Sequence, residues 1–250
     1  MDNHDINLVT RNLQEIMGDF STICKEKIPS MYWGTAPTGT IHIGYFIPLL
    51  KISDFVKAGC TVKILIADLH AYLDNMKSSL QQIEYRTKYY IIMLTEMLKF
   101  LDVDISKIEF VIGKDFQMSP SYIADVYRIN SIVSFNEAKH AGAEVVKQSD
   151  NPMLSSLIYP LLQCLDHHYL GVDCQLGGND QRKIFALSHK VMPKMGFKKG
   201  IQFMTPMLSA LRFKSISDKV DSSNDNDSDQ SDKINDKVDS SNDNDLDQSD

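Results

Sequence analysis

The sequence predicts an α/β protein built around a doubly wound parallel sheet. Apolar, β-rich runs alternate with helical stretches over most of the chain, and each run ends in glycine-rich or polar sequence. This alternation is typical of parallel βαβ units, in which ligands bind beyond the carboxyl ends of the strands. The runs assigned to strands are Tyr32-Trp33, Cys60–Ala67, Lys107–Ile112 and Val172–Leu176.

The first strand leads into a Gly/Pro loop, Thr35–Gly44, and then into an apolar helix from Phe46 to about Lys57. Backbone N–H groups at the start of a helix are free and carry partial positive charge, so this place suits a phosphate. Gly44 would let an anion approach the backbone closely, and His42 can donate to a phosphate oxygen. A competing interpretation, in which His42 only caps the helix, fits the spacing equally well.

The second and third strands deliver further polar residues. The second is followed by Asp68–His70 and the third by Phe116-Gln117, with a helix over Ser78–Phe100 between the two strands. Because the carboxyl ends of parallel strands meet at one edge, we expect these residues near the Thr35–Gly44 loop. This convergence is stronger support for a ligand site than any single motif.

A helix predicted from Asn151 to about Leu170 carries Tyr159, Gln163 and Asp166 on one face, at positions i, i+4 and i+7. An aromatic ring, an amide and a carboxylate on a mostly apolar helix are costly if that face is dry. They therefore either face solvent or line a polar pocket. The periodicity alone leaves both open.

The segments around these strands complete the predicted domain. Residues 1–29 are expected to form a helical lead-in. Ser119–Gln148 reads as a helical insertion with Tyr122 on its apolar face, and it is either a peripheral helical pair or a dimer contact. Gln202–Leu211 is the last segment expected to be ordered.

A double glycine follows the strand Val172–Leu176. Gly177 and Gly178 permit close backbone approach ahead of Gln181 and a helix over Ile184–Val191. A lone Gly-Gly turn is weak evidence for a ligand site. Here it follows a strand, as the other candidate segments do.

Bulk composition narrows the class of protein. The chain has 250 residues, of which 43% are hydrophobic, and four scattered cysteines without a CxxC pair. Neither a metal site nor a disulfide framework is therefore predicted, and a reducing cytoplasm is the simple inference. No apolar run reaches membrane-spanning length, and the N-terminus lacks the layout of a signal peptide.

The negative charge is concentrated at the C-terminus. Residues 218–250 hold 12 Asp, 3 Lys and no Glu or Arg, a net charge of -9 against -7 for the whole chain, so the remainder carries +2. Asp218–Asp232 and Asp236–Asp250 repeat each other except at Ser228 and Leu246. A segment of Asp, Ser, Asn, Gln and Lys cannot bury a core, so residues 216–250 are predicted to be a disordered acidic tail.

Several of these stretches, in order and spacing, together resemble tyrosyl-tRNA synthetases of the archaeal and eukaryotic type. The resemblance covers about Tyr32 to Leu211. It is carried by Tyr32–Gly39 with His42–Tyr45, and by Ala67–Asp74, Asp125–Arg128, Ala141–Gln148, Tyr159–Asp166 and Gly177–Lys183.

The resemblance implies a class I synthetase with a Rossmann-type catalytic domain, here residues 30–215, in a homodimer whose contact is formed by inserted helices at about 119–150. It implies that L-tyrosine and ATP, with Mg²⁺ as the counter-ion of ATP, form tyrosyl adenylate, and that the tyrosyl group passes to the acceptor end of tRNA(Tyr). A pocket that hydrogen-bonds a phenol disfavours tryptophan activation on the same fold.

The resemblance also assigns roles to single residues. Tyr32 and Asp166 match the contacts to the tyrosine hydroxyl, and Tyr159, Gln163 and Gln181 match those to the α-amino group. His42 and Gly44 match the catalytic first ATP motif. Further expected ATP contacts are Gly34, Thr35, Thr40, His70, Gln117, Gly177 and Gly178.

Two departures from the family pattern concern the C-terminal part. The second ATP motif, a Lys-Met-Ser-Ser-Ser type loop, is out of register: ungapped alignment puts Ser215 at the lysine position, and Lys214 fits only with a shift. Arg212 or Lys219 are the other available cations. The acidic repeat stands where the anticodon-binding domain is expected, and its charge would repel tRNA. The sequence thus predicts impaired tyrosine activation, with an inactive tyrosine-binding or dimerising protein as the alternative.

Overall fold

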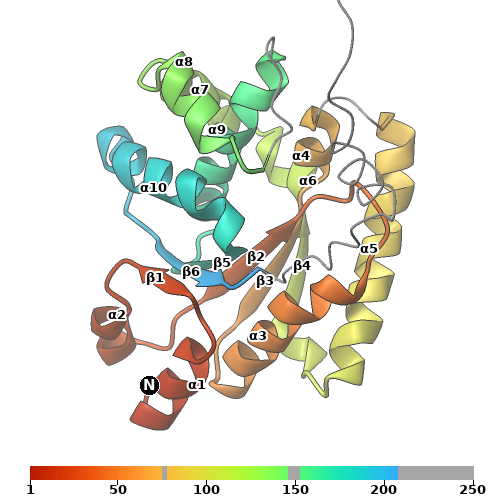
Figure 1. Ribbon diagram of the computed structural model, residues 1–250, viewed down its shortest axis with the longest axis vertical. Helices are drawn as coiled ribbons and strands as arrows, with labels where there is room; N and C mark the ends of the chain where they lie inside the picture. Colours follow the sequence, from red (N-terminus) through yellow and green to blue (C-terminus); the bar gives the residue numbers. More distant parts are fainter. Residues whose placement is uncertain (75–77, 146–152, 208–250) are drawn as a thin grey trace, which may run out of the picture. The chain divides into compact units, whose positions relative to one another are not determined.

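The computed structural model describes residues 1–74, 78–145 and 153–207. Its centre is a six-stranded sheet with the order β1-β6-β5-β2-β3-β4, in which β1 is antiparallel to β6 and every other pair is parallel. Helices cover both faces of this sheet (Figure 1). The predicted doubly wound α/β fold is confirmed.

The strands are β1 Glu15–Met17, β2 Met31–Thr35, β3 Val62–Ile66, β4 Ile108–Ile112, β5 Cys174–Gly178 and β6 Ile201–Thr205. The four strands β2 to β5 correspond to the predicted runs, whereas β1 and β6 were not predicted as strands. The Gly177-Gly178 pair, predicted as a turn, forms the end of β5. β3 and β4 follow on one side of β2, whereas β5 and β6 lie on the other, so the strand order reverses between β2 and β5. Such a switch point opens a crevice at the carboxyl ends of the strands.

Alternation along β2 separates two cores. Met31 and Trp33 join the cluster formed with α3 and α5, whereas Tyr32 belongs to a second cluster on the opposite face with Leu65 and Val172. Successive side chains of a strand point to opposite faces, so burying β2 on both sides fixes the direction of Tyr32. The main helices are α3 Phe46–Lys57, α4 Asp68–Leu73, α5 Leu80–Phe100, α6 Gly113–Gln117, α9 Leu154–Tyr169 and α10 Arg182–Val191.

The N-terminal lead-in is not wholly helical as predicted. It holds α1 (Asn3–Thr10) and α2 (Phe20–Glu26), but β1 lies between them and adds an edge strand to β6. Three residues are too few to show an alternating pattern, and only pairing with β6 makes them a strand.

The predicted insertion forms two separate short helices, α7 (Pro120–Asn130) and α8 (Phe135–Ala141). Residues 146–152, Lys214 and the acidic tail at 216–250 lie outside the described residues. Among the described helices, none has both the length and the apolarity needed to cross a bilayer.

A buried ion cluster fixes the lead-in to α3. Lys51 Nζ donates to the backbone oxygens of Val9 (3.2 Å) and Arg11 (2.5 Å) at the end of α1. Asp54, one turn further along α3, lies 2.9 Å from the ammonium group and also accepts from the Arg11 guanidinium. The side chains of Lys51 and Asp54 are 5% and 7% exposed, so both charges depend on their partners.

We predict that Asp54→Ala lowers the free energy of unfolding by about 3 kcal/mol, because it leaves a buried ammonium without its counter-charge. Urea denaturation measures this loss. The control is Glu84→Ala, which removes an exposed ion pair with Lys88 and should have no measurable effect. Equal stability of the two variants would contradict a structural role for the cluster.

Candidate active site

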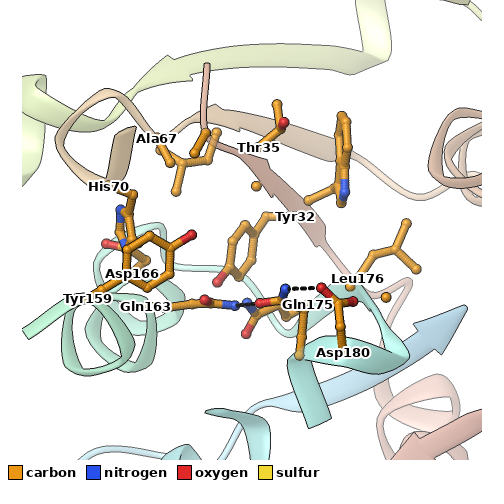
Figure 2. Close-up of a pocket in the computed structure, with 17 residues that line it drawn as sticks. Tyr32, Thr35, Ala67, His70, Tyr159, Gln163, Asp166, Gln175, Leu176 and Asp180 are labelled. Carbon is orange, nitrogen blue, oxygen red and sulfur yellow. Dashed lines mark hydrogen bonds and ion pairs between the residues drawn. The ribbon is translucent and has the colours of Figure 1, made fainter. Parts of the chain in front are cut away.

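A partly open cavity of about 270 Å³ lies at the carboxyl ends of β2 and β5, at the switch point of the sheet (Figure 2). Side chains from β2, β5, α4 and α9 converge on it. The labelled side chains in Figure 2 are Tyr32, Thr35, Ala67, His70, Tyr159, Gln163, Asp166, Gln175, Leu176 and Asp180. The stripe at positions 159, 163 and 166 therefore lines a polar pocket, which settles the choice that periodicity left open.

Tyr32 brings a hydroxyl group to this cavity. Its side chain is 1% exposed and points from β2 toward the side where α9 lies (Figure 2). Among the described residues the hydroxyl has no hydrogen-bond partner. Burial, and next the charge of Asp166, raise the pKa of Tyr32, so the group stays a neutral donor. A buried hydroxyl without a partner is costly, and a polar ligand in the cavity would satisfy it.

Asp166 is a buried carboxylate with two different oxygens. Oδ1 accepts from Gln117 Nε2 and from the Tyr122 hydroxyl, each at 2.7 Å. Oδ2 lies 3.7 Å from His70 Nε2. Burial raises the pKa of Asp166 to about 7. The two hydrogen bonds act in the opposite direction and lower the pKa, because they stabilise the ionised form.

Two residues expected to contact ATP lie next to this carboxylate. His70 is 2% exposed, and its ring meets the Tyr159 ring edge-on at 4.6 Å. Gln117 is 1% exposed and donates a hydrogen bond to Asp166. Both residues lie at the predicted edge of the sheet, and their side chains are directed toward α9; their contacts to ATP stay predictions.

A chain of amides lines another part of the cavity. Gln163 Nε2 donates to Gln181 Oε1 at 3.0 Å, and Gln181 Nε2 donates to Asp180 Oδ2 at 2.8 Å. The amide oxygens and the Asp180 carboxylate make this wall rich in acceptors, which suits a cationic group. Asp180 was not singled out by the sequence, although it lies beside Gln181 in the motif.

A second cavity, of about 410 Å³, adjoins the first. Trp33, Thr35, Gly177 and Gly178 line both cavities. The remaining wall of the second cavity comes from His42–Tyr45, Ile47, Pro48 and Thr205–Met207. A ligand in the first cavity can therefore reach one in the second past the end of β2.

His42 both caps a helix and faces the second cavity. Its Nδ1 accepts from the Gly44 N–H at 3.2 Å, at the turn that leads into α3. The proton of the neutral ring is then on Nε2, which is left to donate. A Cβ at Gly44 would lie 2.9 Å from His42 Cε1, so glycine makes room for the imidazole. The two interpretations of His42 are thus compatible.

The other expected ATP contacts differ in their positions. Gly34 and Thr35 lie at the end of β2 on the wall of the first cavity. Gly177 could not carry a side chain, since a Cβ there would lie 2.7 Å from Phe185 Cζ. Thr40, by contrast, is exposed and lines neither cavity, and its expected contact to ATP stays a prediction.

Helix α5 holds the loop between β2 and α3. The Arg86 guanidinium donates to the Thr38 backbone oxygen at 3.1 Å, and it also contacts Ser78 Oγ. The Tyr45 hydroxyl donates to that of buried Tyr90 at 3.1 Å. These contacts from α5 could not be predicted from the sequence, because the helical pattern does not show which positions contact the loop.

We predict that the His70 imidazole stays neutral down to about pH 4, because burial lowers its pKa to that value. Imidazole ¹³C shifts measured against pH test this, with His70→Ala assigning the signal. Protonation of His70 near its ordinary pKa of 6.5 would contradict the dry environment described for Asp166 and its neighbours.

Comparisons with known proteins agree with this arrangement. The family model for class I tRNA synthetases (W and Y) matches residues 25–244. The chain is 50% identical over 214 residues to the cytoplasmic tyrosine–tRNA ligase of Saccharomyces cerevisiae, covering 84% of this chain and 54% of that protein. It is 51% identical over 220 residues to the probable cytoplasmic tyrosine–tRNA ligase of Encephalitozoon cuniculi, covering 87% and 64%.

Solved structures lead to the same family. The tyrosyl-tRNA synthetase of Archaeoglobus fulgidus, solved with L-tyrosine, has a TM-score of 0.75 and 34% identity, covering 81% of this chain and 63% of that one. The chain thus spans roughly half to two thirds of the length of these relatives. With the fold, the paired cavities and the family match in agreement, the chain belongs to the class I tRNA synthetases of the tryptophan and tyrosine group.

Proposed function

We propose that this chain joins L-tyrosine and ATP to form tyrosyl adenylate and passes the tyrosyl group to tRNA(Tyr) in the cytoplasm. The observation that carries the proposal is the pair of joined cavities. One is lined by the Asp166 carboxylate and by the Tyr32 hydroxyl, which has no hydrogen-bond partner in the part of the chain that the structure describes, and the other is lined by His42. The names of the most similar relatives support the same activity.

The first cavity suits a phenol. A tyrosine hydroxyl can donate to Asp166 Oδ2 and accept from Tyr32, which satisfies both buried groups at once. Phenylalanine would leave both without partners, and tyrosyl-tRNA synthetases as a class reject it by roughly 10^5 in this way. An indole N–H lacks an acceptor for Tyr32, which argues against tryptophan.

The acceptor-rich wall suits the α-ammonium group of the same ligand. Gln163 and Gln181 offer amide oxygens, and the Tyr159 hydroxyl is expected to complete the set. With the ring and the ammonium group held, the α-carboxylate would lie toward the second cavity, where ATP is proposed to bind. Gly34, Thr35, Gly177 and Gly178 border that passage.

The proposed reaction needs positioning more than proton transfer. The α-carboxylate is already ionised, attacks the α-phosphorus in line and expels pyrophosphate, so no general base is required. The His42 Nε2–H would donate to the phosphates as negative charge moves off the phosphorus. Mg²⁺ enters as the counter-ion of ATP rather than as a resident metal.

The second ATP motif favours a weaker enzyme. Such a lysine typically contributes several kcal/mol to the transition state, and only Arg212, Lys214 and Lys219 are available near its position. This out-of-register motif is the observation that favours the alternative function, in which a synthetase-derived protein binds tyrosine without turnover.

A homodimer is proposed through the inserted helices. Several large apolar side chains on or next to α7 and α8 are exposed, and exposed apolar side chains that gather in one region can mark a contact surface. They are Ile123 (37%), Tyr127 (73%), Ile132 (36%) and Phe135 (56%).

We predict tyrosine-dependent exchange of pyrophosphate into ATP by the purified chain. His42→Ala should lower the exchange rate about 10²-fold or more, because it removes a donor to the transition state. His4→Ala, an exposed histidine that lines neither cavity, is the control. No exchange by the natural chain, together with exchange by Ser215→Lys, would exclude the active enzyme and favour the tyrosine-binding alternative.

We predict that Tyr127→Asp converts a dimer into a monomer of 28.3 kDa in sedimentation analysis, because a charge cannot be buried in an apolar contact. Tyr85→Asp on α5, a position that is 63% exposed, is the matched control and should remain dimeric. If the natural chain sediments as a monomer, the inserted helices are a peripheral pair.

A further inference from the structure

We propose that Tyr122, on the inserted helix α7, is a positioning residue that determines amino-acid selectivity by holding Asp166 in place. The inference rests on the proposed function, because it concerns how that site reads a phenol. Tyr122 lines neither cavity, so it can act on a ligand only through another residue.

The geometry divides the carboxylate into a held oxygen and a free one. Oδ1 accepts from Tyr122 and Gln117, each at 2.7 Å, and both donors lie behind the cavity wall. Oδ2 has neither donor and shares the cavity side with His70. Rotation of the carboxylate would break two short bonds, so one oxygen alone is presented to the ligand.

The Tyr122 hydroxyl is itself fixed in place. It is 1% exposed and lies between two acceptors, Asp166 Oδ1 and the Leu162 backbone oxygen at 3.0 Å. Its ring packs edge-on against Tyr169 at 4.7 Å and Phe116 at 5.7 Å. Because the ring is held by packing, removing the hydroxyl alone isolates its effect on the carboxylate.

A hydroxyl between two acceptors responds to the charge of Asp166. When Asp166 is ionised, Tyr122 donates to Oδ1. When Oδ1 is protonated, the hydroxyl can accept from it and donate to Leu162 instead. Only the ionised form offers the phenol a charged acceptor, which makes the stronger hydrogen bond, so selectivity is linked to pH.

Among the described residues, five other titratable side chains surround Asp166. Tyr32 faces it from β2, His70 from α4 and Tyr122 from α7, and Tyr159 and Cys164 belong to its own helix. Burial raises the pKa values of the three tyrosines and of the Cys164 thiol and lowers that of His70 to about 4, so all five are neutral near pH 7. The titration of the site near neutral pH is therefore that of Asp166.

The test compares Tyr122→Phe with the natural chain by calorimetric binding of L-tyrosine and L-phenylalanine between pH 5 and 9. Losing a hydrogen bond to a charged group should weaken L-tyrosine binding at pH 7 about tenfold and leave that of L-phenylalanine unchanged. Binding of L-tyrosine by the natural chain should fall below pH 7, since a protonated, neutral Asp166 is a weaker acceptor for the phenol than the charged carboxylate. In Tyr122→Phe this midpoint should move to higher pH, because a donor to the ionised form is gone.

Tyr169→Phe is the matched control. The Tyr169 hydroxyl donates to Asp125 Oδ2 at 2.7 Å in the same helical layer, but it does not touch Asp166. This variant should keep the selectivity and the pH midpoint of the natural chain.

The outcomes separate the two proposals. A Tyr122→Phe variant with an unchanged pH midpoint, or one that weakens both ligands equally, overturns the positioning role alone. No binding of L-tyrosine by the natural chain overturns the proposed function and, with it, the inference.

Discussion

The burial of the Asp166 carboxylate is the constraint on which the site depends. A carboxylate that is 1% exposed is stable only with donors around it. Gln117 from α6 and Tyr122 from α7 supply two of them and so connect both segments to α9. The remaining oxygen would be left for the proposed phenol ligand, so the interaction that packs α6 and α7 against α9 would also set the specificity that we propose for the pocket.

The reversal of strand order between β2 and β5 places this carboxylate near the proposed ATP site. Because Trp33, Thr35 and the end of β5 line both cavities, the cavity lined by Asp166 adjoins the one lined by His42. Arg86 and Tyr90 on α5 hold the loop between β2 and α3 in place through hydrogen bonds. The Lys51 and Asp54 cluster holds α3 against the end of α1. A site that acts by positioning requires such fixed walls.

The sequence predicted the sheet and the ligand edge well, because hydrophobic periodicity and glycine-rich loops are local signals. It failed where the signal is tertiary. The strand β1 exists only by pairing with β6. His70 and Gln117 were placed at the correct edge, but their contacts with Asp166 were not predicted, since strand order does not give side-chain direction. Tyr122 looked like an ordinary apolar-face residue, and only the packing of α7 on α9 brings its hydroxyl to Asp166.

The central claim is that Asp166 and Tyr32 recognise the phenol group of the ligand through hydrogen bonds. The most direct measurement is the ratio of the dissociation constants of L-phenylalanine and L-tyrosine at pH 8, for the natural chain and for Asp166→Asn. The account predicts that the natural chain binds L-tyrosine at least about a hundredfold more tightly and that Asp166→Asn loses most of this preference. Equal affinities for the two amino acids in the natural chain, or an unchanged ratio in the variant, would contradict it.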